Sequence, residues 1–429
     1  MIPEVRDRIE QIRQGIMPEG YKKTKDTFVP AEWRTYRIRD FATVSQGFTF
    51  KRDFQGNSHG NWNYFKVADI GLETNGKYLT KALNTISDDI MNQIGCVPFK
   101  AGSIVFPRVG AALLNNNKKL LAQDSIVDDN VLVLSVTNAD VCDNEYIYYA
   151  LQNTRLEDWC NSGLVPVINS KTVNKHILHL PSVREQKKIA EILSTQDKAI
   201  ALQGRKIEEL KRFKKGCMER MFPRKGQKVP EKRFPGFTGN WEQRKLGDIS
   251  DSSSGGTPTV GVKEYYGGTI PFIRSAEIDS DSTELYITEE GLKKSSARLV
   301  SEGDILYALY GATSGEVGRA RLNGAINQAI LVIRPSDGYD REYITQWLRK
   351  NKQIIIDTYL QGGQGNLSGI IIKNLVVQLP SQPEQEVIGA YFASLDHLIT
   401  LHQRKLDEMQ KQKKALMQLL LTGIVRVKT

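Results

Sequence analysis

The sequence of 429 residues contains two copies of one unit, and this duplication limits its possible folds more than any other feature. Trp33–Asp40 resembles Trp241–Asp248 at an offset of 208 residues, and Leu180-Pro-Ser182 recurs as Leu379-Pro-Ser381 at an offset of 199. The second offset is constant over residues 180–221, where 15 of 42 positions are identical. The chain is therefore expected to contain two related globular parts, each followed by a closely related segment.

The globular parts combine short apolar runs with Gly, Asn, Asp and Pro turn signals, and helical stretches are expected around residues 144–160 and 341–360. This pattern is typical of mixed α/β (α+β) domains. The runs expected to form strands include Ile104–Phe106, Val131–Leu134, Ile330–Ile333 and Ile370–Ile372. The expected order is an N-terminal helix and leader at 1–29, a globular domain at 30–180, a spacer helix and linker at 181–232, a second globular domain at 233–379 and a C-terminal spacer helix at 380–429.

Each spacer helix is expected to begin with a capping box, Ser182 with Glu185 and Ser381 with Glu384. Beyond each box, apolar residues recur at alternating spacings of four and three, which predicts a seam that faces a partner helix. We expect the two helices to pair as a long antiparallel coiled coil that separates the domains with pseudo-two-fold symmetry. The apolar seam residues are Ile189, Leu193, Ile200, Ile207, Leu210, Met221, Ile388, Phe392, Leu395, Ile399, Leu406, Met409, Leu416 and Leu420.

Polar residues interrupt the seam at corresponding positions, Gln203 with His402 and Lys214 with Lys413. Such residues are expected to set the register of the pair. The alternative is that each helix is buried separately against its own domain.

The formal net charge is +10, and the basic excess is concentrated in two stretches. Residues 205–233 contain twelve Lys or Arg and four Glu, and residues 403–429 contain seven basic and two acidic side chains. These stretches favour a polyanion such as DNA, or alternatively an acidic surface of a partner protein. No apolar run approaches the roughly 18 residues of a membrane span, and the charged start lacks a signal-peptide core. Together with four scattered cysteines, this favours a cytoplasmic protein.

Motifs for catalysis are missing from the sequence. There is no Pro-Pro pair for an adenine methyltransferase motif, no GxxxxGK[ST] phosphate loop, no GxGxxG and no HExxH. The carboxylate pairs Asp88-Asp89 and Asp128-Asp129 are better explained as loop or capping residues than as a metal site. We expect a non-catalytic chain that binds no metal or cofactor of its own.

The sequence resembles the specificity (S) subunits of type I restriction-modification systems over nearly its whole length. The shared motifs are Leu180-Pro-Ser-Val-Arg-Glu-Gln186 and Leu379-Pro-Ser-Gln-Pro-Glu-Gln385 at the heads of the helices, the linker Arg233–Trp241, Gly47-Phe-Thr-Phe-Lys51, Gly255-Gly-Thr-Pro258, Gly303-Asp-Ile-Leu306 and Gly311-Ala-Thr-Ser-Gly315. The first domain departs from the pattern at Asn115–Lys119, where the second has the turn Gly315–Gly318.

The resemblance implies two target recognition domains, each reading one half of a split, asymmetric sequence in double-stranded DNA. It implies that the helices form a spacer and dock two methyltransferase (M) subunits, and that restriction (R) subunits join the assembly. S-adenosylmethionine, ATP and Mg would then belong to those partners, which methylate adenine or cleave DNA. The alternative is a coiled-coil adaptor that binds proteins without reading DNA.

Candidate DNA contacts are Lys and Arg for phosphates, and Arg, Asn, Gln and Lys for base edges. Among them Asn366 is favoured, because its Gly-rich loop permits close approach of the backbone. In the first domain the candidates are Lys51, Arg52, His59, Lys66, Arg108, Asn116, Lys118, Lys119, Asn169 and Lys171. In the second they are Thr257, Thr259, Lys263, Arg274, Arg298, Tyr310, Gln361, Gln364 and Asn366.

The N-terminal helix, from Pro3 to about Gln14, has no counterpart ahead of the second domain. Two interpretations are open: it packs on the end of the spacer or on a partner subunit, or it is a weakly anchored leader.

Overall fold

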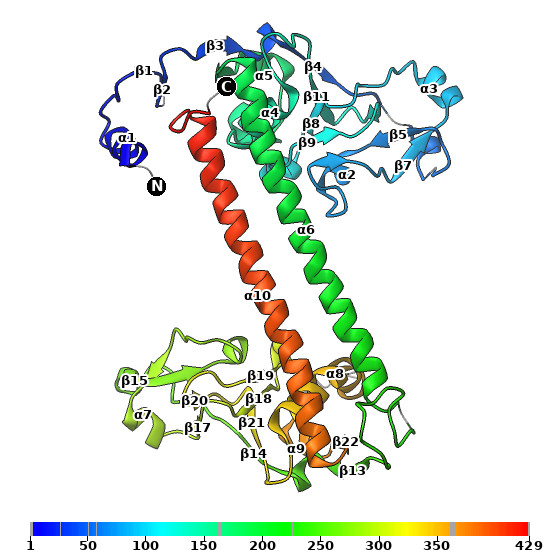
Figure 1. The fold of residues 1–429 in the computed structure, drawn as a ribbon, viewed down its shortest axis with the longest axis vertical. Coiled ribbons are helices and arrows are strands. Elements are labelled where there is room, and N and C mark those ends of the chain that lie inside the picture. Colours follow the sequence, from blue (N-terminus) through cyan, green and yellow to red (C-terminus); the bar gives the residue numbers. More distant parts are fainter. Residues whose placement is uncertain are drawn as a thin grey trace. The chain divides into compact units, whose positions relative to one another are not determined.

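The structure, a computed structural model, describes residues 3–25, 27–49, 51–56, 58–161, 165–224, 226–360 and 366–427. Its internal contacts divide the chain into two compact units (Figure 1). Unit 1 comprises residues 1–202 and 406–429, and unit 2 comprises residues 203–405. Each unit contains one globular domain and parts of both long helices, and each is described by itself.

The first domain, in unit 1, is built on a mainly antiparallel five-stranded sheet. Its strands are β3 (Arg34–Arg37), β4 (Ala42–Gln46), β5 (Trp62–Phe65), β6 (Tyr78–Leu79), β7 (Asn84–Ile86), β8 (Ile104–Pro107), β9 (Lys119–Leu121), β10 (Ile126–Val127), β11 (Val131–Val136) and β12 (Ile177–Leu180). Its helices are α2 (Val67–Gly71), α3 (Asp88–Ile94), α4 (Asn144–Gln152) and α5 (Ser170–Lys175). The main sheet has the order β4-β11-β8-β9-β6, a smaller one has the order β10-β5-β7, and β12 pairs with β3.

The second domain, in unit 2, repeats this plan. Its strands are β13 (Glu242–Lys245), β14 (Ser250–Ser254), β15 (Tyr266–Ile273), β16 (Tyr286–Ile287), β17 (Arg298–Val300), β18 (Ile305–Ala308), β19 (Val317–Arg319), β20 (Gly324–Ile326), β21 (Ile330–Pro335) and β22 (Val376–Leu379). Its helices are α7 (Glu289–Lys293), α8 (Arg341–Tyr359) and α9 (Gly369–Lys373). The sheets have the orders β14-β21-β18-β19 and β16-β15-β20-β17, and β13 pairs with β22. The central strands β11 and β21 therefore have equivalent neighbours.

One predicted strand is a helix. The run Ile370–Ile372 was expected to be extended, but it lies in α9, where the Ser368 side chain accepts a hydrogen bond from the Ile371 amide. Ile372 is buried whereas Ile370 is 73% exposed. A run of three apolar residues does not distinguish strand from helix, and here the capping serine decides.

The two long helices are α6 (Val183–Met221) and α10 (Gln382–Leu421), and they lie antiparallel in each unit (Figure 1). In unit 1, Gln196 donates to the carbonyl of Met409 at 3.3 Å. In unit 2, Gln203 Nε2 lies 2.8 Å from both the carbonyl oxygen and Nδ1 of His402. Each predicted apolar seam residue is buried or half-buried. These contacts favour a helix pair over separate burial. No helix among the described residues is long and apolar enough to cross a membrane.

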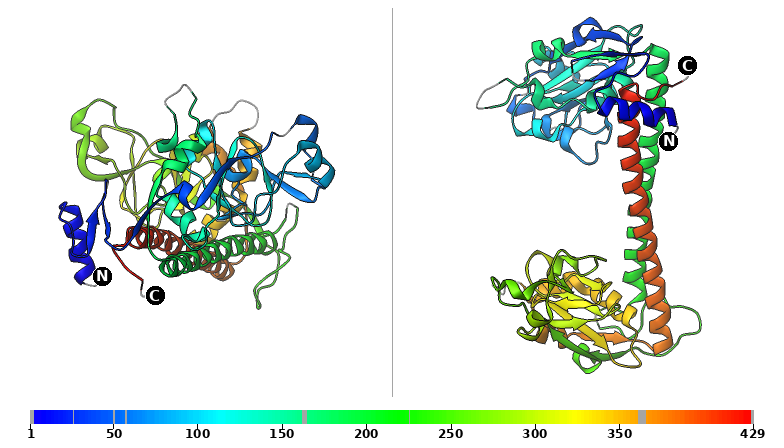
Figure 2. Two further views of the ribbon diagram at one scale, coloured as in Figure 1. Left: turned by 90° about the horizontal axis from the view of Figure 1, so that it is seen from above. Right: turned by 90° about the vertical axis from the view of Figure 1, so that its left-hand side faces the viewer.

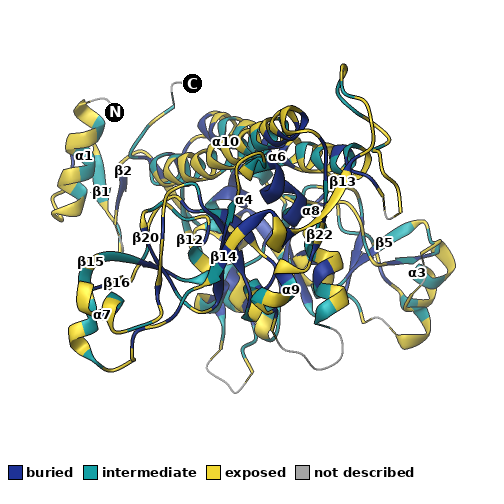
Figure 3. Cartoon of the chain, turned by 90° about the horizontal axis from the view of Figure 1, so that it is seen from below, coloured by how far each residue is buried: buried dark blue, intermediate teal, exposed yellow. Residues whose placement is uncertain are grey.

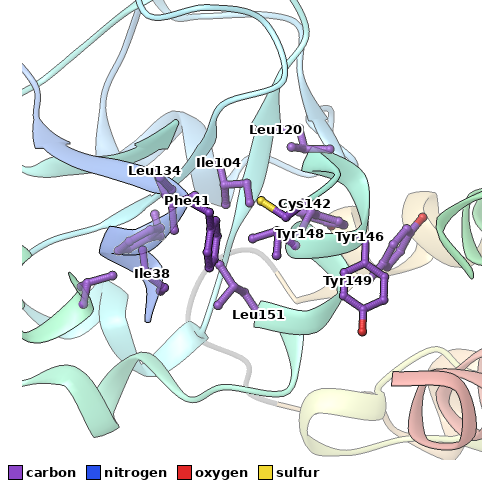
Figure 4. Packing of buried hydrophobic residues seen from close by; sticks show 14 of the residues in the cluster. Ile38, Phe41, Ile104, Leu120, Leu134, Cys142, Tyr146, Tyr148, Tyr149 and Leu151 are labelled. Atoms are coloured by element: carbon purple, nitrogen blue, oxygen red, sulfur yellow. The ribbon is translucent and has the colours of Figure 1, made fainter. Parts of the chain in front are cut away.

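The core of unit 1 is continuous from the domain into the helices. Phe41, Tyr146 and Leu151 of the domain pack together (Figure 4). They belong to one buried cluster with Ile189 and Leu193 of α6. The domain is therefore joined to α6 by a shared apolar core.

The core of unit 2 is continuous in the same way. The Phe222 ring, just after α6, stacks on Tyr343 of α8 with centroids 5.5 Å apart and lies 5.9 Å from Phe392 of α10. These three side chains have at most 1% exposure. Domain and helices thus share one core in this unit too.

The N-terminal leader of unit 1 contains α1 (Pro3–Arg13), β1 (Tyr21–Lys23) and β2 (Phe28–Pro30). None of the residues in α1 is buried (Figure 3). Arg8 donates to the carbonyl of Ile424, and the Tyr21 hydroxyl donates to the carbonyl of Gly423 at 2.5 Å. The leader therefore lies at the C-terminal end of α10, as the first of the two interpretations requires (Figure 2).

Candidate nucleic-acid interface

In each domain, a loop that begins with glycine follows the first strand of the main sheet, β4 or β14. This loop lies against the turn that precedes the central strand, β11 or β21. In the first domain the Gly47 amide donates to the carbonyl of Val131, and in the second the Gly255 amide donates to that of Ile330, both at 3.1 Å. A Cβ atom at Gly47 would lie 2.3 Å from the carbonyl oxygen of Asp128, and one at Gly255 would lie 2.1 Å from that of Ile326. Only glycine permits this approach, so the loop backbones are fixed in both domains.

The strand ends beside these loops are held by a second repeated set of backbone hydrogen bonds. The Arg108 amide donates to the carbonyl of Asn130 at 2.8 Å, and the Leu309 amide donates to that of Ala329 at 2.7 Å. The carbonyls of Arg108 and Leu309 in turn accept from Ile168 and Leu367. Four chain segments therefore meet at the same place in each domain. We call this meeting place the loop cluster: residues 47–49, 108–109, 128–130 and 167–169 in the first domain, and 255–257, 309–310, 327–329 and 366–368 in the second.

The side chains carried by the two loop clusters differ. Thr49 donates to Asp129 at 3.1 Å, whereas the equivalent Thr257 donates to Gln328, which is exposed. Asp129 presents a charged acceptor, whereas an amide such as that of Gln328 has both a donor and an acceptor. One backbone scaffold thus presents two different chemical surfaces.

A cavity of about 550 Å³ adjoins the loop cluster of the first domain. Its lining includes Thr49, Lys66, Val109 and Asp129. Asp128 lines it as well, so one lysine, one threonine and two aspartates line a single concave surface. Its two carboxylates suit the amino group of a base edge rather than a phosphate.

The structure brings several sequence candidates together at the loop clusters. In the first domain Arg108 and Asn169 lie there, and Lys66 lines the adjoining cavity. In the second domain Thr257 lies there, and Tyr310 forms an isolated β-bridge with Asn366. The Asn169 side chain also caps α5 by accepting from the Lys171 amide at 2.8 Å. Exposed candidates outside the clusters are Lys51, Arg52, His59, Lys171, Thr259, Lys263 and Arg298.

Two candidates in the first domain have structural roles instead. Lys118 is 2% exposed and donates to the side chain of Asn116 and the carbonyl of Thr154, both at 2.8 Å. Burial lowers the pKa of Lys118 to about 8. Asn116 has a left-handed backbone (φ 52°) and accepts from the Leu156 amide. The prediction of DNA contact was therefore wrong for Lys118, because its ammonium group is enclosed by protein.

Two further candidates form contacts within their own domains. Lys119 Nζ donates to the carbonyl of Asn75 at 2.8 Å. Arg274 forms ion pairs with Glu277 at 2.7 Å and Glu284 at 2.8 Å. Burial would raise the pKa of Glu277, but hydrogen bonds from the side chain and backbone of Arg274 outweigh it and hold that pKa at about 2. Candidates Gln361 and Gln364 lie outside the described residues.

The motif at the head of each long helix fixes the domain to that helix. The buried Gln186 accepts from the Asp143 amide at 2.9 Å, at the start of α4. The buried Gln385 accepts from the Asp340 amide at 3.0 Å, at the start of α8. The glutamine of this motif therefore joins the start of each long helix to the start of a helix in its domain, a contact that the capping-box pattern did not predict.

The carboxylates of the glutamates in the same motif bind arginines. Glu185 forms a two-point ion pair with Arg426, and Glu384 forms one with Arg233 through N–O contacts of 2.6 Å. Arg426 lies just after α10 and binds the glutamate at the start of α6. Arg233 lies after α6 and binds the glutamate at the start of α10. The serine half of the predicted box is present in the first copy, where Ser182 Oγ accepts from the Glu185 amide at 3.3 Å. The predicted bond from the cap amide to the glutamate is not among the described contacts, in which both carboxylates serve this glutamate–arginine clasp.

Two equivalent α/β domains, each fixed to a long helix, define a protein that presents two related but chemically different loop clusters. The family model described as "Type I restriction modification DNA specificity domain" matches residues 30–212 and again 238–411. The chain belongs to this family. It is a DNA sequence-specificity subunit, which agrees with the expected resemblance and not with the adaptor alternative.

Curated relatives match over almost the entire chain. The type I restriction enzyme MjaVIII specificity subunit of Methanocaldococcus jannaschii is 23% identical, covering 97% of this chain and 98% of the relative. The putative MjaX specificity subunit of the same organism is 24% identical, covering 96% and 98%.

A solved structure shares the fold. The S subunit of a type I restriction-modification system from M. genitalium superposes with a TM-score of 0.61 at 14% identity, covering 94% of this chain and 99% of that one. This likeness supports the mixed α/β architecture with two recognition domains.

Proposed function

We propose that this chain reads a bipartite, asymmetric sequence in double-stranded DNA, one half with each recognition domain. The observation that carries the proposal is the pair of loop clusters, which share backbone hydrogen bonds but present Asp129 in one domain and Gln328 in the other. A carboxylate accepts from cytosine N4, and a glutamine pairs with adenine N6 and N7. Different side chains on one scaffold suit the reading of two different half-targets.

We also propose that the chain is the non-catalytic member of its assembly. In this proposal it positions two methyltransferase subunits that methylate adenine with S-adenosylmethionine, and restriction subunits that use ATP and Mg to cleave DNA, in the cytoplasm. A second solved structure, which superposes with a TM-score of 0.53 at 16% identity, was determined to explain "complex assembly" of the type I system. That relative's assembly into a complex supports the existence of such partners here.

A domain exchange tests the proposed function. Replacing residues 242–379, which begin and end on the paired strands β13 and β22, by the corresponding part of another specificity subunit should change one half of the methylated target and leave the other half unchanged. The exchanged subunit is reconstituted with its methyltransferase, and the methylated sites are mapped by sequencing. A change in both halves, or methylation by the isolated chain with S-adenosylmethionine, would contradict the proposal.

A single substitution tests the loop cluster. Gln328→Ala should weaken methylation of the wild-type target about tenfold to a hundredfold, because one bidentate base contact contributes about 1–3 kcal/mol, and it should relax the preference at one base of one half. Methylation rates on a set of single-base target variants measure both effects. Gln353→Ala is the matched control, because Gln353 is an exposed glutamine of α8 whose side chain, among the described contacts, donates to its own helix neighbour Asp357. Equal losses for both variants, or a retained preference at each base, would reject the assignment.

A further inference from the structure

Each long helix carries an aspartate that is identical in the two copies, Asp197 on α6 and Asp396 on α10. In unit 1, one oxygen of Asp197 accepts from Lys413 of α10 at 2.5 Å. The other oxygen accepts from the Tyr149 hydroxyl of α4 at 2.5 Å. One carboxylate therefore ties three elements together: its own helix, the antiparallel helix and the recognition domain.

The same junction recurs in unit 2 with different partners. One oxygen of Asp396 accepts from Lys214 of α6 at 2.5 Å. The other accepts from Gln346 of α8 at 2.8 Å and from Arg349 of α8 at 3.1 Å. Arg349 also forms an ion pair with Asp279 at 3.1 Å, so the network of contacts extends from α8 into a loop of the domain. Lys214 and Lys413, expected to set register, bind these aspartates.

The junctions are partly shielded from water. The side chains of Asp197 and Lys413 are 22% and 24% exposed, and those of Asp396 and Lys214 are 31% and 14% exposed. Charge-assisted hydrogen bonds in such places are short and directional. Rotation of a recognition domain on its helices would break the bond from Tyr149 or Gln346, whereas sliding of one helix would break the bond from lysine.

We propose that Asp197 and Asp396 are positioning residues that fix the orientation of each recognition domain on the helix pair, and thereby the gap at which the two half-targets are read. This inference rests on the proposed bipartite reading. Asp396 has more connections to its domain than Asp197, so its loss should have the larger effect.

The test measures gap discrimination in the complete complex with its methyltransferase subunits. Substrates carry the wild-type half-targets with the gap shortened or lengthened by one or two base pairs. For Asp396→Ala, the ratio of the methylation rate on the wild-type gap to that on an altered gap should fall about tenfold, as expected for loss of a hydrogen bond to a charged group. The base preference within each half should stay unchanged. Asp396→Asn, which keeps an acceptor for Gln346, should recover part of the discrimination.

Tyr149→Phe tests the junction of unit 1 with little disturbance of packing, because it removes only the hydroxyl, which donates to Asp197 and accepts from Lys77 at 3.0 Å. It should also widen gap tolerance, and it keeps the test decisive if an alanine variant fails to fold. Glu191→Gln is the control, since it neutralises an exposed ion pair with Lys188 on the same helix and should leave discrimination unchanged.

A uniform loss of rate at every gap length, or a lowered melting temperature with unaltered gap ratios, would show a merely structural role and overturn the inference. Failure of the proposed function is recognised separately. A wild-type complex that methylates all gap lengths equally would overturn the bipartite reading, and the inference would fall with it.

Discussion

Removing seven residues from each long helix should shorten the gap between the two half-targets by about three base pairs. The segments to delete are 200–206 and 399–405, which are equivalent in the two copies and are centred on the hydrogen-bonded residues Gln203 and His402. Seven residues are two turns of the apolar repeat, so the seam still faces its partner. They correspond to about 10 Å of helix, or about three steps of duplex DNA.

Sequencing of methylated sites in a host that carries the shortened subunit measures the new gap directly. Deleting five residues from each helix at the same place is the control, because five residues are about 1.4 turns, which rotates the seam away from its partner and should abolish activity. Retained activity with an unchanged gap would show that the helices do not determine the spacing.

Glu384→Ala should lower the free energy of unfolding by about 3 kcal/mol. The Glu384 side chain is fully buried, and its partner Arg233 is 17% exposed. Removing one member of a buried pair leaves the other charge without compensation, which costs about 3–5 kcal/mol in comparable cases. Arg233 retains bonds to the carbonyls of Thr238 and Gly239, which places the expected loss at the lower end.

Chemical denaturation of the wild type and the variant gives the difference in unfolding free energy. Glu386→Ala is the control, because Glu386 is exposed on the same helix and accepts only from Gln382 in the described contacts. Glu185→Ala should cost less than Glu384→Ala, since Arg426 is 34% exposed and also pairs with Glu32. Equal small effects for all three variants would show that the clasp does not stabilise the fold.

The sequence predicted the parts of the fold that depend on periodicity. The duplication and the paired helices follow from regular patterns that extend over many residues. Local patterns were weaker: the run Ile370–Ile372 fits strand and helix equally, and a lysine such as Lys118 carries no mark of its burial. A side chain's exposure depends on the three-dimensional fold, so single-residue candidates were the least predictable.

The contacts that fix the domains could not be predicted, because their partners are far apart in the chain. Glu384 lies 151 residues from Arg233, and Glu185 lies 241 residues from Arg426. The repeated glutamates fit the capping-box pattern, which predicts a local partner three residues away. Asp197 and Asp396 are identical in the two copies, but identity alone does not predict which residues they bind. The sequence around Gln328 forms no pattern that predicts its exposed position beside Thr257.

The glycines at 47 and 255 hold the loop backbones so close to neighbouring carbonyls that a side chain there is excluded. Side chains that differ between the two clusters, such as the half-buried Asp129 and the exposed Gln328, therefore stand on the same backbone. Under the proposed reading of DNA by these clusters, new target preferences can accordingly evolve, or be engineered, by exchanging a few side chains without rebuilding the loops. A small combinatorial library at these positions is the economical place to search for altered sequence choice.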